Sequence, residues 1–362
     1  MSKLDTIILG AGVVGLSTAR QLLLRGARVT VLDPSVPGGQ GSRAAAGVAI
    51  PSVRLLGDPD MRAFASASKP VMAAELDALG GKDGGVKRGQ GVLRLAADAK
   101  GKDVLEKQAA ESPEWMGRWV GPEELAELEP AMRGSKVLGA YLDEAAHMVD
   151  TGAYLNALLA DVGARGGVLK LGHAATGITE EDGKVRVHTQ GEDLVADRVV
   201  VAAGAWSGTI PGISRLPLKP MRGQMMTIWH PTIRLTRVLS GAGYLAPWRG
   251  GEIVVGATEE DVGFACHTSP AGLLYLSAVI QRTTPALAEA RVGTAWAGLR
   301  SATPSGRPMI GAWPGTTRVV VASGHGGQGI MTGALSGRLA ADLCDSGKAP
   351  EAEPFAPSRS SS

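Results

Sequence analysis

The chain has 362 residues, of which 44% are hydrophobic and 20% charged, and its formal net charge at pH 7 is +2. This length supports a large core and favours two domains, and the near-neutral charge argues against a nucleic-acid partner. Cys266 and Cys344 lie far apart and outside any C-x-x-C pattern, so we expect neither a disulfide framework nor a metal site.

The sequence predicts neither a transmembrane segment nor a signal peptide. No apolar run approaches the roughly 18 residues that span a bilayer, so we expect no transmembrane segment. The first predicted strand begins a few residues after Met1, which leaves no room for a signal peptide. We therefore expect a cytoplasmic protein.

A glycine-rich turn stands near the start of the chain. An apolar strand over 6–9 runs directly into Gly10-Ala11-Gly12-Val13-Val14-Gly15. A helix over 16–25 and a second strand over 28–32 follow, and the second strand ends at Asp33. This order of strand, G-x-G-x-x-G turn, helix and strand predicts a βαβ unit that binds an adenine dinucleotide.

Each residue of this unit has a physical task. Gly10 permits the tight turn, Gly12 lets the backbone approach a pyrophosphate, and Gly15 lets the helix pack closely on the strand. The helix N-terminus offers free N–H groups to the phosphates. Asp33 follows Gly15 by 18 residues and is placed to accept the ribose hydroxyls. An acid there argues against an NADP 2′-phosphate and leaves NAD and FAD open.

The next segment, 34–48, is rich in glycine and small residues, which would let a flat ring or a phosphate lie against the backbone. Ser42 and Arg43 are candidate donors to a pyrophosphate or to a flavin edge. A flexible surface loop is the alternative interpretation of this composition.

Periodicity predicts the remaining elements. We expect helices over 59–80, 101–129, 269–289 and 331–343, and one through 154–159 that Asp150 or Thr151 caps. We expect strands over 86–95, 137–142, 167–171, 225–229, 243–248 and 252–258, and a hairpin over 175–179 and 184–188. Trp115, Met116 and Trp119 are expected to be packing residues.

Two further strands end in glycine turns. The run 197–201 reads as a central parallel strand and leads to Ala202-Ala203-Gly204-Ala205-Trp206-Ser207, at the carboxyl end where α/β sheets place ligands. The strand over 318–323 leads through Gly324, His325 and Gly326 into a helix. The N-terminus of that helix is suited to the electron-rich edge of a reduced flavin.

Several runs, taken together and in order, resemble one family. They are the Gly10–Gly15 turn with Asp33, Ser42–Gly47, Ala202–Ser207, Arg222-Gly223-Gln224, Gly243–Pro247, Val255–Phe264, Gly298-Leu299-Arg300 with Thr303-Pro304, and Gly324-His325. The chain resembles the FAD-dependent oxidases of the D-amino acid oxidase (DAO) superfamily over nearly its whole length. The Val255–Phe264 and Gly298–Pro304 runs are most similar to the glycine oxidase (ThiO) branch.

The resemblance implies an α/β fold, with a Rossmann-like FAD/NAD(P)-binding domain interleaved with a β-rich α+β substrate domain. We assign 1–80, 146–212 and 298–345 to the FAD-binding domain. We assign 81–145 and 213–297 to the substrate domain, and 346–362 to a partly disordered tail.

It also implies FAD without a covalent link, and a substrate held between the flavin and the sheet. Arg300 would pair with the substrate carboxylate, which a guanidinium fork suits better than a lysine would. Tyr244 would form a wall of the site. The implied cofactor residues are Gly10, Gly12, Val13, Val14, Gly15, Asp33, Ser42, Arg43, Ala46, Gly47, Val48, Ala203, Gly204, Trp206, Arg300, Gly326, Gly327, Gln328, Gly329 and Ile330.

Each singled-out side chain also has a structural interpretation. Arg300 would then make a surface or interdomain salt bridge, and Tyr244 would be an ordinary hydrogen-bonded tyrosine of the sheet. For His325 we favour a packing or hydrogen-bonding role beside the flavin over that of a catalytic base.

The implied reaction is hydride transfer from the α-carbon of a neutral amine to the flavin, which needs no obligatory base. Glycine or a small D-amino acid would give an imine, then a keto acid, with O2 or another electron acceptor as partner and a homo-oligomer allowed. The alternatives are a D-amino acid dehydrogenase that uses a quinone or carrier, a tailoring oxidase of a larger amine, and a non-catalytic flavin-binding subunit. Gly327, where glycine oxidases usually carry Arg, and Glu259, after Ala257-Thr258, depart from the glycine oxidase pattern.

Overall fold

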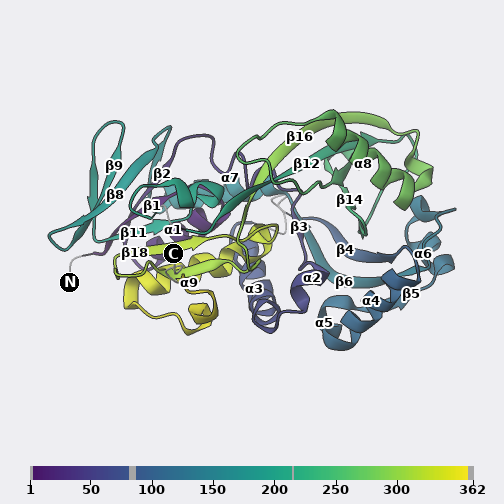
Figure 1. Ribbon diagram of the computed structural model, residues 1–362, viewed down its shortest axis with the longest axis horizontal. Helices are drawn as coiled ribbons and strands as arrows, with labels where there is room; N and C mark the ends of the chain where they lie inside the picture. Colours follow the sequence, from purple (N-terminus) through teal and green to yellow (C-terminus); the bar gives the residue numbers. More distant parts are fainter. Residues whose placement is uncertain (1–2, 81–86, 214–215, 358–362) are drawn as a thin grey trace.

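A six-stranded sheet and a nine-stranded sheet lie beside each other along the long axis of the molecule in the computed structural model (Figure 1). The structure describes residues 3–80, 87–213 and 216–357. The smaller sheet has the order β17-β18-β11-β1-β2-β7, and all of its neighbours are parallel except β17 and β18. Its strands are β1 (Asp5–Leu9), β2 (Arg28–Asp33), β7 (Val168–Leu171), β11 (Arg198–Val201), β17 (Met309–Ala312) and β18 (Val319–Ser323).

Four long helices accompany this sheet: α1 (Val13–Leu24), α3 (Pro59–Ala78), α7 (Thr151–Ala164) and α9 (Gly329–Ser346). Helix α7 begins where expected, because the Asp150 carboxylate accepts a hydrogen bond from Ala153 N. Helices α1 and α9 approach closely through small residues. An added Cβ at Gly337 would lie 2.7 Å from atoms of Ser17, so the two backbones are nearly in contact.

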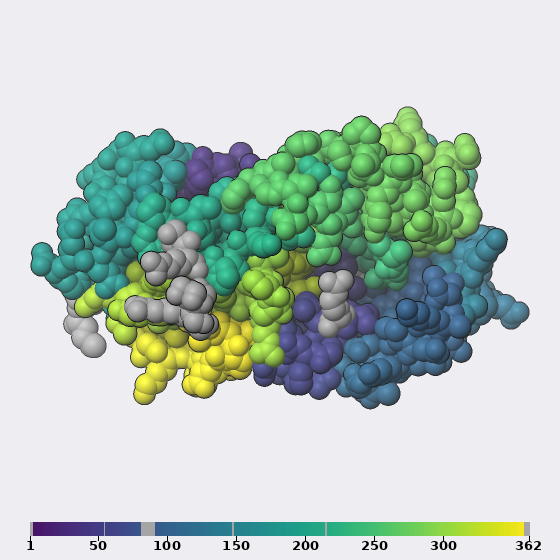
Figure 2. Space-filling model, viewed as in Figure 1, coloured from purple at the N-terminus to yellow at the C-terminus, as the bar shows by residue number. Residues whose placement is uncertain are grey.

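The nine-stranded sheet joins distant parts of the chain. Its order is β16-β12-β15-β14-β13-β4-β6-β3, with β5 added beside β6, and only β13 and β4 run parallel. The strands are β3 (Val48–Ala49), β4 (Lys87–Ala96), β5 (Arg118–Val120), β6 (Gly139–Val149), β12 (Lys219–Trp229), β13 (Val238–Ser240), β14 (Tyr244–Pro247), β15 (Ile253–Gly256) and β16 (Arg291–Ala302). Figure 2 shows the blue segment near 100–140 and the green segment near 230–300 at the same end of the molecule.

The helical stretch expected over 101–129 is broken in the structure. It consists of α4 (Ala99–Glu111), α5 (Pro113–Met116), β5 and α6 (Pro122–Leu128). Gly117 ends α5 with φ +72°, and an added Cβ there would lie 1.9 Å from Leu142 O, so the chain turns tightly onto β6. Trp115 and Met116 are buried, as expected of packing residues, and Trp119 is half-buried.

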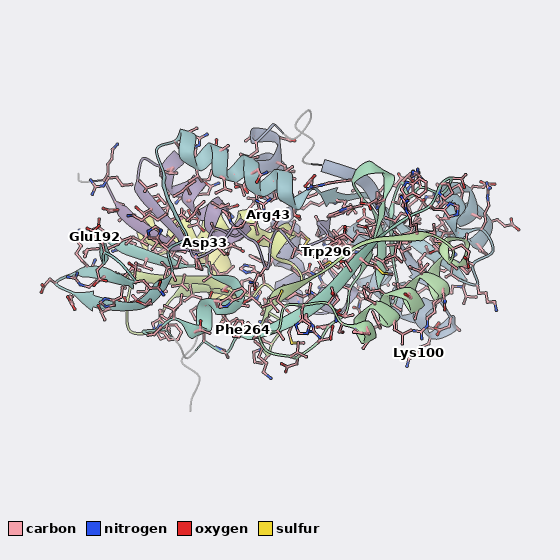
Figure 3. All side chains as sticks on the ribbon, turned by 90° about the horizontal axis from the view of Figure 1, so that it is seen from above. Asp33, Arg43, Lys100, Glu192, Phe264 and Trp296 are labelled. Carbon is pink, nitrogen blue, oxygen red and sulfur yellow. The ribbon has the colours of Figure 1, made fainter. Side chains whose placement is uncertain are left out.

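The predicted hairpin is present as β8 (Ala175–Glu181) and β9 (Lys184–Thr189), which pair with β10 (Leu194–Ala196) in a small sheet. Its turn residues, Asp182 and Gly183, both have positive φ, as the two-residue hairpin turn of this hand requires. Glu192 marks this end of the molecule and Lys100 the other in Figure 3, with Asp33 and Trp296 between them.

The two faces of the large sheet bury different clusters. Leu93, Leu95 and Leu142 pack with α8 (Pro270–Thr283) on the outer face. Val92, Met148 and Met225 lie in a second cluster together with Ala46. Because side chains alternate along a strand, Arg94 shares the face of Val92, and this face turns toward the six-stranded sheet.

The remaining short elements connect these layers. They are α2 (Val53–Leu56), η1 (Pro130–Met132), η2 (Gly204–Thr209), η3 (Arg249–Gly251), η4 (Pro285–Leu287) and η5 (Pro350–Phe355). No helix within the described ranges is both long and apolar enough to cross a bilayer.

Single strands cross two of the expected domain limits. The limits at 145/146 and 297/298 fall inside β6 and β16, because single strands carry the chain from one part to the other. Of the tail expected to be partly disordered, residues 346–357 are described, and 358–362 lie outside the described residues. Phe355 is buried and lies 4.7 Å from Phe64, measured between ring centroids, so aromatic burial outweighs the polar composition of the segment.

Candidate active site

A cavity of about 900 Å³ lies between the carboxyl ends of the parallel strands and the inner face of the large sheet. Most of the predicted site residues line it. They are Gly10, Gly12, Val13, Val14, Asp33, Ser42, Ala46, Gly47, Val48, Ala203, Gly204, Trp206, Tyr244, Arg300, Gly326, Gly327, Gln328, Gly329 and Ile330. The position is the one expected for an open α/β sheet, because β1 and β11 lie side by side where the strand order reverses.

The glycine turn divides its tasks between packing and access. An added Cβ would lie 2.5 Å from Ala202 O at Gly10 and 1.9 Å from Gly10 O at Gly15, so both positions are filled by the chain itself. At Gly12 only Ser42 Oγ lies within 4 Å, at 3.2 Å. Gly15 therefore supports the turn without lining the cavity, whereas Gly12 leaves backbone open to a ligand.

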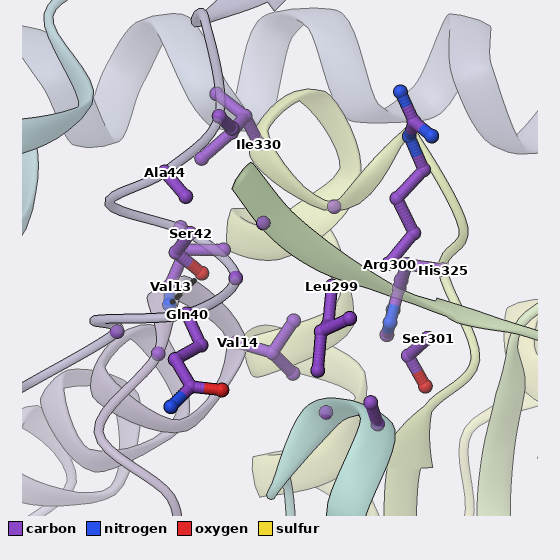
Figure 4. A pocket seen from close by; sticks show the side chains of 18 of the residues that line it. Val13, Val14, Gln40, Ser42, Ala44, Leu299, Arg300, Ser301, His325 and Ile330 are labelled. Atoms are coloured by element: carbon purple, nitrogen blue, oxygen red, sulfur yellow. Dashed lines mark hydrogen bonds between the residues drawn. The ribbon is translucent and has the colours of Figure 1, made fainter. Parts of the chain in front are cut away.

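Asp33 and Ser42 hold this turn in place. Ala11 N donates to Asp33 Oδ2 at 2.8 Å, and Ser35 N donates to Asp33 Oδ1 at 2.9 Å. Val13 N donates to Ser42 Oγ at 3.1 Å, the dashed line of Figure 4. The Arg43 side chain, a predicted donor to a pyrophosphate or flavin, is directed to other partners in the structure. Its guanidinium donates to Asn156 Oδ1 and Pro37 O, and Arg43 does not line the cavity.

The second glycine turn brings α9 to the cavity. Gly326 N donates to Ser301 O at 2.7 Å, which ties the turn to β16. His325 is buried, and its Nε2 lies 2.8 Å from Ser336 Oγ. Burial lowers the pKa of His325 to about 4, so the imidazole is neutral at physiological pH. This geometry supports a hydrogen-bonding role for His325.

Arg300 reaches across the large sheet. Its guanidinium covers Gly223, where an added Cβ would lie 2.7 Å from Nη2, and Nη1 donates to Thr258 O at 2.9 Å. In Figure 4, Arg300 extends away from the first glycine turn, whereas Leu299 points toward Val14. Among the described residues no carboxylate forms an ion pair with Arg300, which argues against the salt-bridge alternative. Its remaining N–H groups are available to a ligand.

Tyr244 stands beside this guanidinium. It pairs with Gly256, and an added Cβ on that glycine would lie 2.3 Å from the tyrosine hydroxyl, so the ring lies over bare backbone. Burial raises the pKa of Tyr244 to about 12, although the positive charge of Arg300 acts in the opposite direction. The hydroxyl is therefore neutral and can donate a hydrogen bond.

A polar network behind Arg300 was not predicted from the sequence. Glu260 accepts hydrogen bonds from Arg222 Nη2 at 2.5 Å, Thr258 Oγ1 at 2.5 Å and Gln224 Nε2 at 2.7 Å. Burial acts to raise the pKa of Glu260, but these hydrogen bonds lower it to about 2. Glu259, the acid that the family pattern singled out, is exposed and does not line the cavity. An isolated antiparallel β-bridge between Arg222 and Glu260 turns the Glu260 side chain inward. No local sequence pattern predicts this pairing.

A second arginine also escaped sequence reasoning. Arg94, in β4, lines the cavity and has only 2% of its surface exposed. The sequence shows a polar residue between Leu93 and Leu95, which is the alternation expected of a strand. The sequence does not show on which face of the sheet Arg94 lies.

The cavity fits a flavin dinucleotide. Its lining includes the N-terminal residues of both α1 and α9, whose free N–H groups suit phosphate and electron-rich oxygens. Bare backbone at Gly12 and the small residues Ala44, Ala45 and Ala46 leave room for a flat ligand. These features agree with the chemistry of the predicted dinucleotide site.

Comparisons with known proteins agree with this geometry. Residues 5–343 match the sequence model of the family described as "DAO: FAD dependent oxidoreductase". Glycine oxidase of Pseudomonas aeruginosa is 31% identical over 367 residues, which cover 97% of this chain and 98% of that protein. The crystal structure of glycine oxidase from Geobacillus kaustophilus superposes with a TM-score of 0.89, at 24% identity, and covers 99% of both chains.

A longer relative matches as well. The bifunctional protein ThiO/ThiG of Trichormus variabilis is 31% identical over 349 residues, which cover 94% of this chain and 52% of that protein. The chain thus spans about half the length of this relative.

Proposed function

The chain belongs to the DAO family of FAD-dependent oxidoreductases, and from this premise we propose that it oxidises glycine or another small amino acid as glycine oxidases do. One observation carries the proposal. Arg300 is held against the cavity by Thr258 O, has no described acid partner, and keeps free N–H groups beside the neutral hydroxyl of Tyr244. A guanidinium in this setting suits a carboxylate.

Named residues would hold FAD without a covalent link. Asp33 would meet the ribose, Gly12 and Ser42 the pyrophosphate, and Gly47 with the turn 326–330 the ring system. Bound FAD would supply a two-electron acceptor for the hydride of the substrate α-carbon. Denaturation with acid should release all of the yellow colour into the supernatant, and retention in the pellet would contradict a non-covalent link.

The chain's own contribution is binding and orientation. Arg300 would hold the substrate carboxylate and Tyr244 would confine it, so that the α-carbon faces the ring. Asp33 is the only carboxylate among the described lining residues, and it stands at the first glycine turn, where it accepts hydrogen bonds from Ala11 N and Ser35 N. The substrate amine would therefore react in its neutral form, without a carboxylate base. Loss of hydride from the α-carbon of the neutral amine leaves an iminium ion, which gives a proton to water and becomes the imine. Water then converts the imine to a keto acid and ammonia.

The decisive experiment is anaerobic mixing of the flavin-loaded protein with glycine, sarcosine and small D- and L-amino acids. We expect one of these to bleach the visible flavin band. Rapid return of colour in air, with hydrogen peroxide formed, supports an oxidase, and slow return supports a dehydrogenase with another acceptor. If none of them bleaches a fully loaded protein, the small-amino-acid proposal is wrong.

A further inference from the structure

Arg94 is a buried cation whose hydrogen bonding is incomplete. Its Nη2 donates to Pro51 O at 3.2 Å, and its Nη1 is buried without a hydrogen-bond partner among the described residues. Burial lowers the pKa of Arg94 to about 10, while the charge of Asp143 acts to raise it, so the side chain is cationic at neutral pH. A buried charge with an unpaired N–H is costly unless a ligand completes it.

The nearby acid does not complete it. Asp143 pairs across the sheet with Val92 and so shares the face of Arg94. Ala145 N donates to its Oδ1 at 2.9 Å, but its Oδ2 has no partner within the described part of the chain. No ion pair within 4 Å joins Asp143 to Arg94, and Asp143 does not line the cavity. Arg94 lines the cavity and Asp143 does not, so a ligand in the cavity is the candidate partner for the unpaired N–H of Arg94.

Arg94 belongs to the substrate wall. In the sheet Arg94 is opposite Ser240, and Ser240 is opposite Tyr244, so the three side chains share one face in one row. All three line the cavity. Two strand spacings, about 10 Å between backbones, separate Arg94 from Tyr244. Arg300 lies beyond Tyr244, so the wall carries a cation on each side of the tyrosine.

We propose that Arg94 is a second carboxylate-binding residue of this cavity, and that the preferred substrate is an amino acid that carries two acid groups. This inference rests on the proposed function, in which Arg300 holds the carboxylate next to the reacting carbon. The second carboxylate, on the amine nitrogen or at the end of the side chain, would pair with Arg94. A neutral side chain would leave the buried N–H unsatisfied.

Binding of unreactive acids tests this without turnover. Oxydiacetate and methoxyacetate are a matched pair that differ by one carboxylate, and their binding to the flavin-loaded protein is measured by the change in flavin absorbance. We expect oxydiacetate to bind at least tenfold more tightly. Arg94→Gln should reduce this ratio to near one, whereas Arg282→Gln, which removes a charge from the exposed end of α8, should preserve it. Equal binding of both acids to the unmodified protein would overturn the inference.

Two substrate pairs locate the second acid group. A comparison of iminodiacetate with sarcosine tests a second carboxylate on the amine nitrogen. A comparison of D-aspartate with D-alanine tests a second carboxylate on the side chain. We expect kcat/KM to favour the diacid at least tenfold in one pair. If small monoacids reduce the flavin and neither diacid is preferred, the role of Arg94 is wrong while the proposed function stands. If no amino acid reduces the flavin and neither probe acid binds, the proposed function itself fails.

Discussion

At the scale of single residues, the site depends on one cation held by neutral backbone. Arg300 donates to Thr258 O, and Thr258 is held in turn by Glu260 through its hydroxyl and by Gln224 N. A carbonyl acceptor orients the guanidinium without neutralising its charge. This arrangement leaves the full charge for a ligand, which an ion pair within the protein would not.

Arg300→Ala should weaken substrate binding by several kcal/mol, about 2–5, because a carboxylate loses its charged partner. The measurement is KM for the best substrate, together with the dissociation constant of methoxyacetate. The KM of Arg300→Lys should lie between the values of the unmodified protein and of the alanine variant, because lysine keeps the positive charge but not the forked guanidinium. An unchanged KM in the alanine variant would remove Arg300 from the site.

Glu260→Gln tests the network behind Arg300. Glutamine keeps one acceptor oxygen but leaves the buried Arg222 without its counter-charge, so we expect a loss of about 1–3 kcal/mol in the free energy of unfolding. KM should rise several-fold because Thr258 loses its anchor. Glu259→Gln, at the exposed neighbouring position, is the matched control and should change neither quantity. Equal effects in both variants would contradict the positioning role of Glu260.

At the scale of elements, close helix packing shapes the nucleotide-binding part. Helices α1 and α9 begin at the two glycine turns that line the cavity, so their separation sets the distance between those turns. An added Cβ at Gly333 would lie 2.9 Å from the Val13 side chain, and one at Gly337 would lie 2.7 Å from the backbone carbon of Ser17 and from Thr18 N. Small residues on α9 thus allow both helix N-termini to face one ligand.

Gly337→Val should force these helices apart and destabilise the protein by about 2–4 kcal/mol, as overpacking of a core does. Thermal unfolding and the flavin dissociation constant measure the effect. Gly163→Ala provides the control, because Gly163 lies in α7 with nothing within 4 Å of an added Cβ. That change should stabilise the protein by about 0.5 kcal/mol through helix propensity. A tolerated valine at 337 would show that the helices can separate freely.

At the scale of the whole molecule, the two large sheets share one cavity, and buried titratable groups link its stability to pH. His325 lies in the turn that joins β18 to α9 and bonds to Ser336 within α9. Glu75 is buried against Ser17 and Tyr154, and burial raises its pKa, although these hydrogen bonds act to lower it. The two groups act in opposite directions on acidification, so only a comparison of variants separates them.

The free energy of unfolding should depend on His325 between pH 4 and 6.5. Its pKa is lowered to about 4 in the folded protein, so in this window the unfolded chain binds more protons. Stability from this group is present above pH 6.5 and is lost as the pH falls toward 4, by about 3 kcal/mol in total.

Denaturant unfolding at several pH values measures this dependence. His325→Gln should flatten the slope in the acid window relative to the unmodified protein, while the opposing contribution of Glu75 cancels in the difference. Identical slopes would mean that His325 does not titrate in this way.

The features that could be predicted from the sequence are local. The first βαβ unit, Asp33 at the end of its second strand, the hairpin at Asp182-Gly183 and the strand before His325 follow from periodicity and turn chemistry within about 30 residues. The G-x-G-x-x-G spacing also predicted the first glycine turn, most of whose residues line the cavity, because short-range geometry leaves few alternatives.

Contacts between residues far apart in the sequence could not be predicted in this way. Arg94 comes into one row with Ser240 and Tyr244 through the parallel pairing of β4 with β13, across more than 140 residues of chain. Glu260 rather than Glu259 turns inward through its β-bridge to Arg222. Likewise Arg43 turns to Asn156, and the 101–129 helix breaks at Gly117 against β6. Local periodicity does not predict such pairings, because the register between distant strands depends on the packing of the whole sheet.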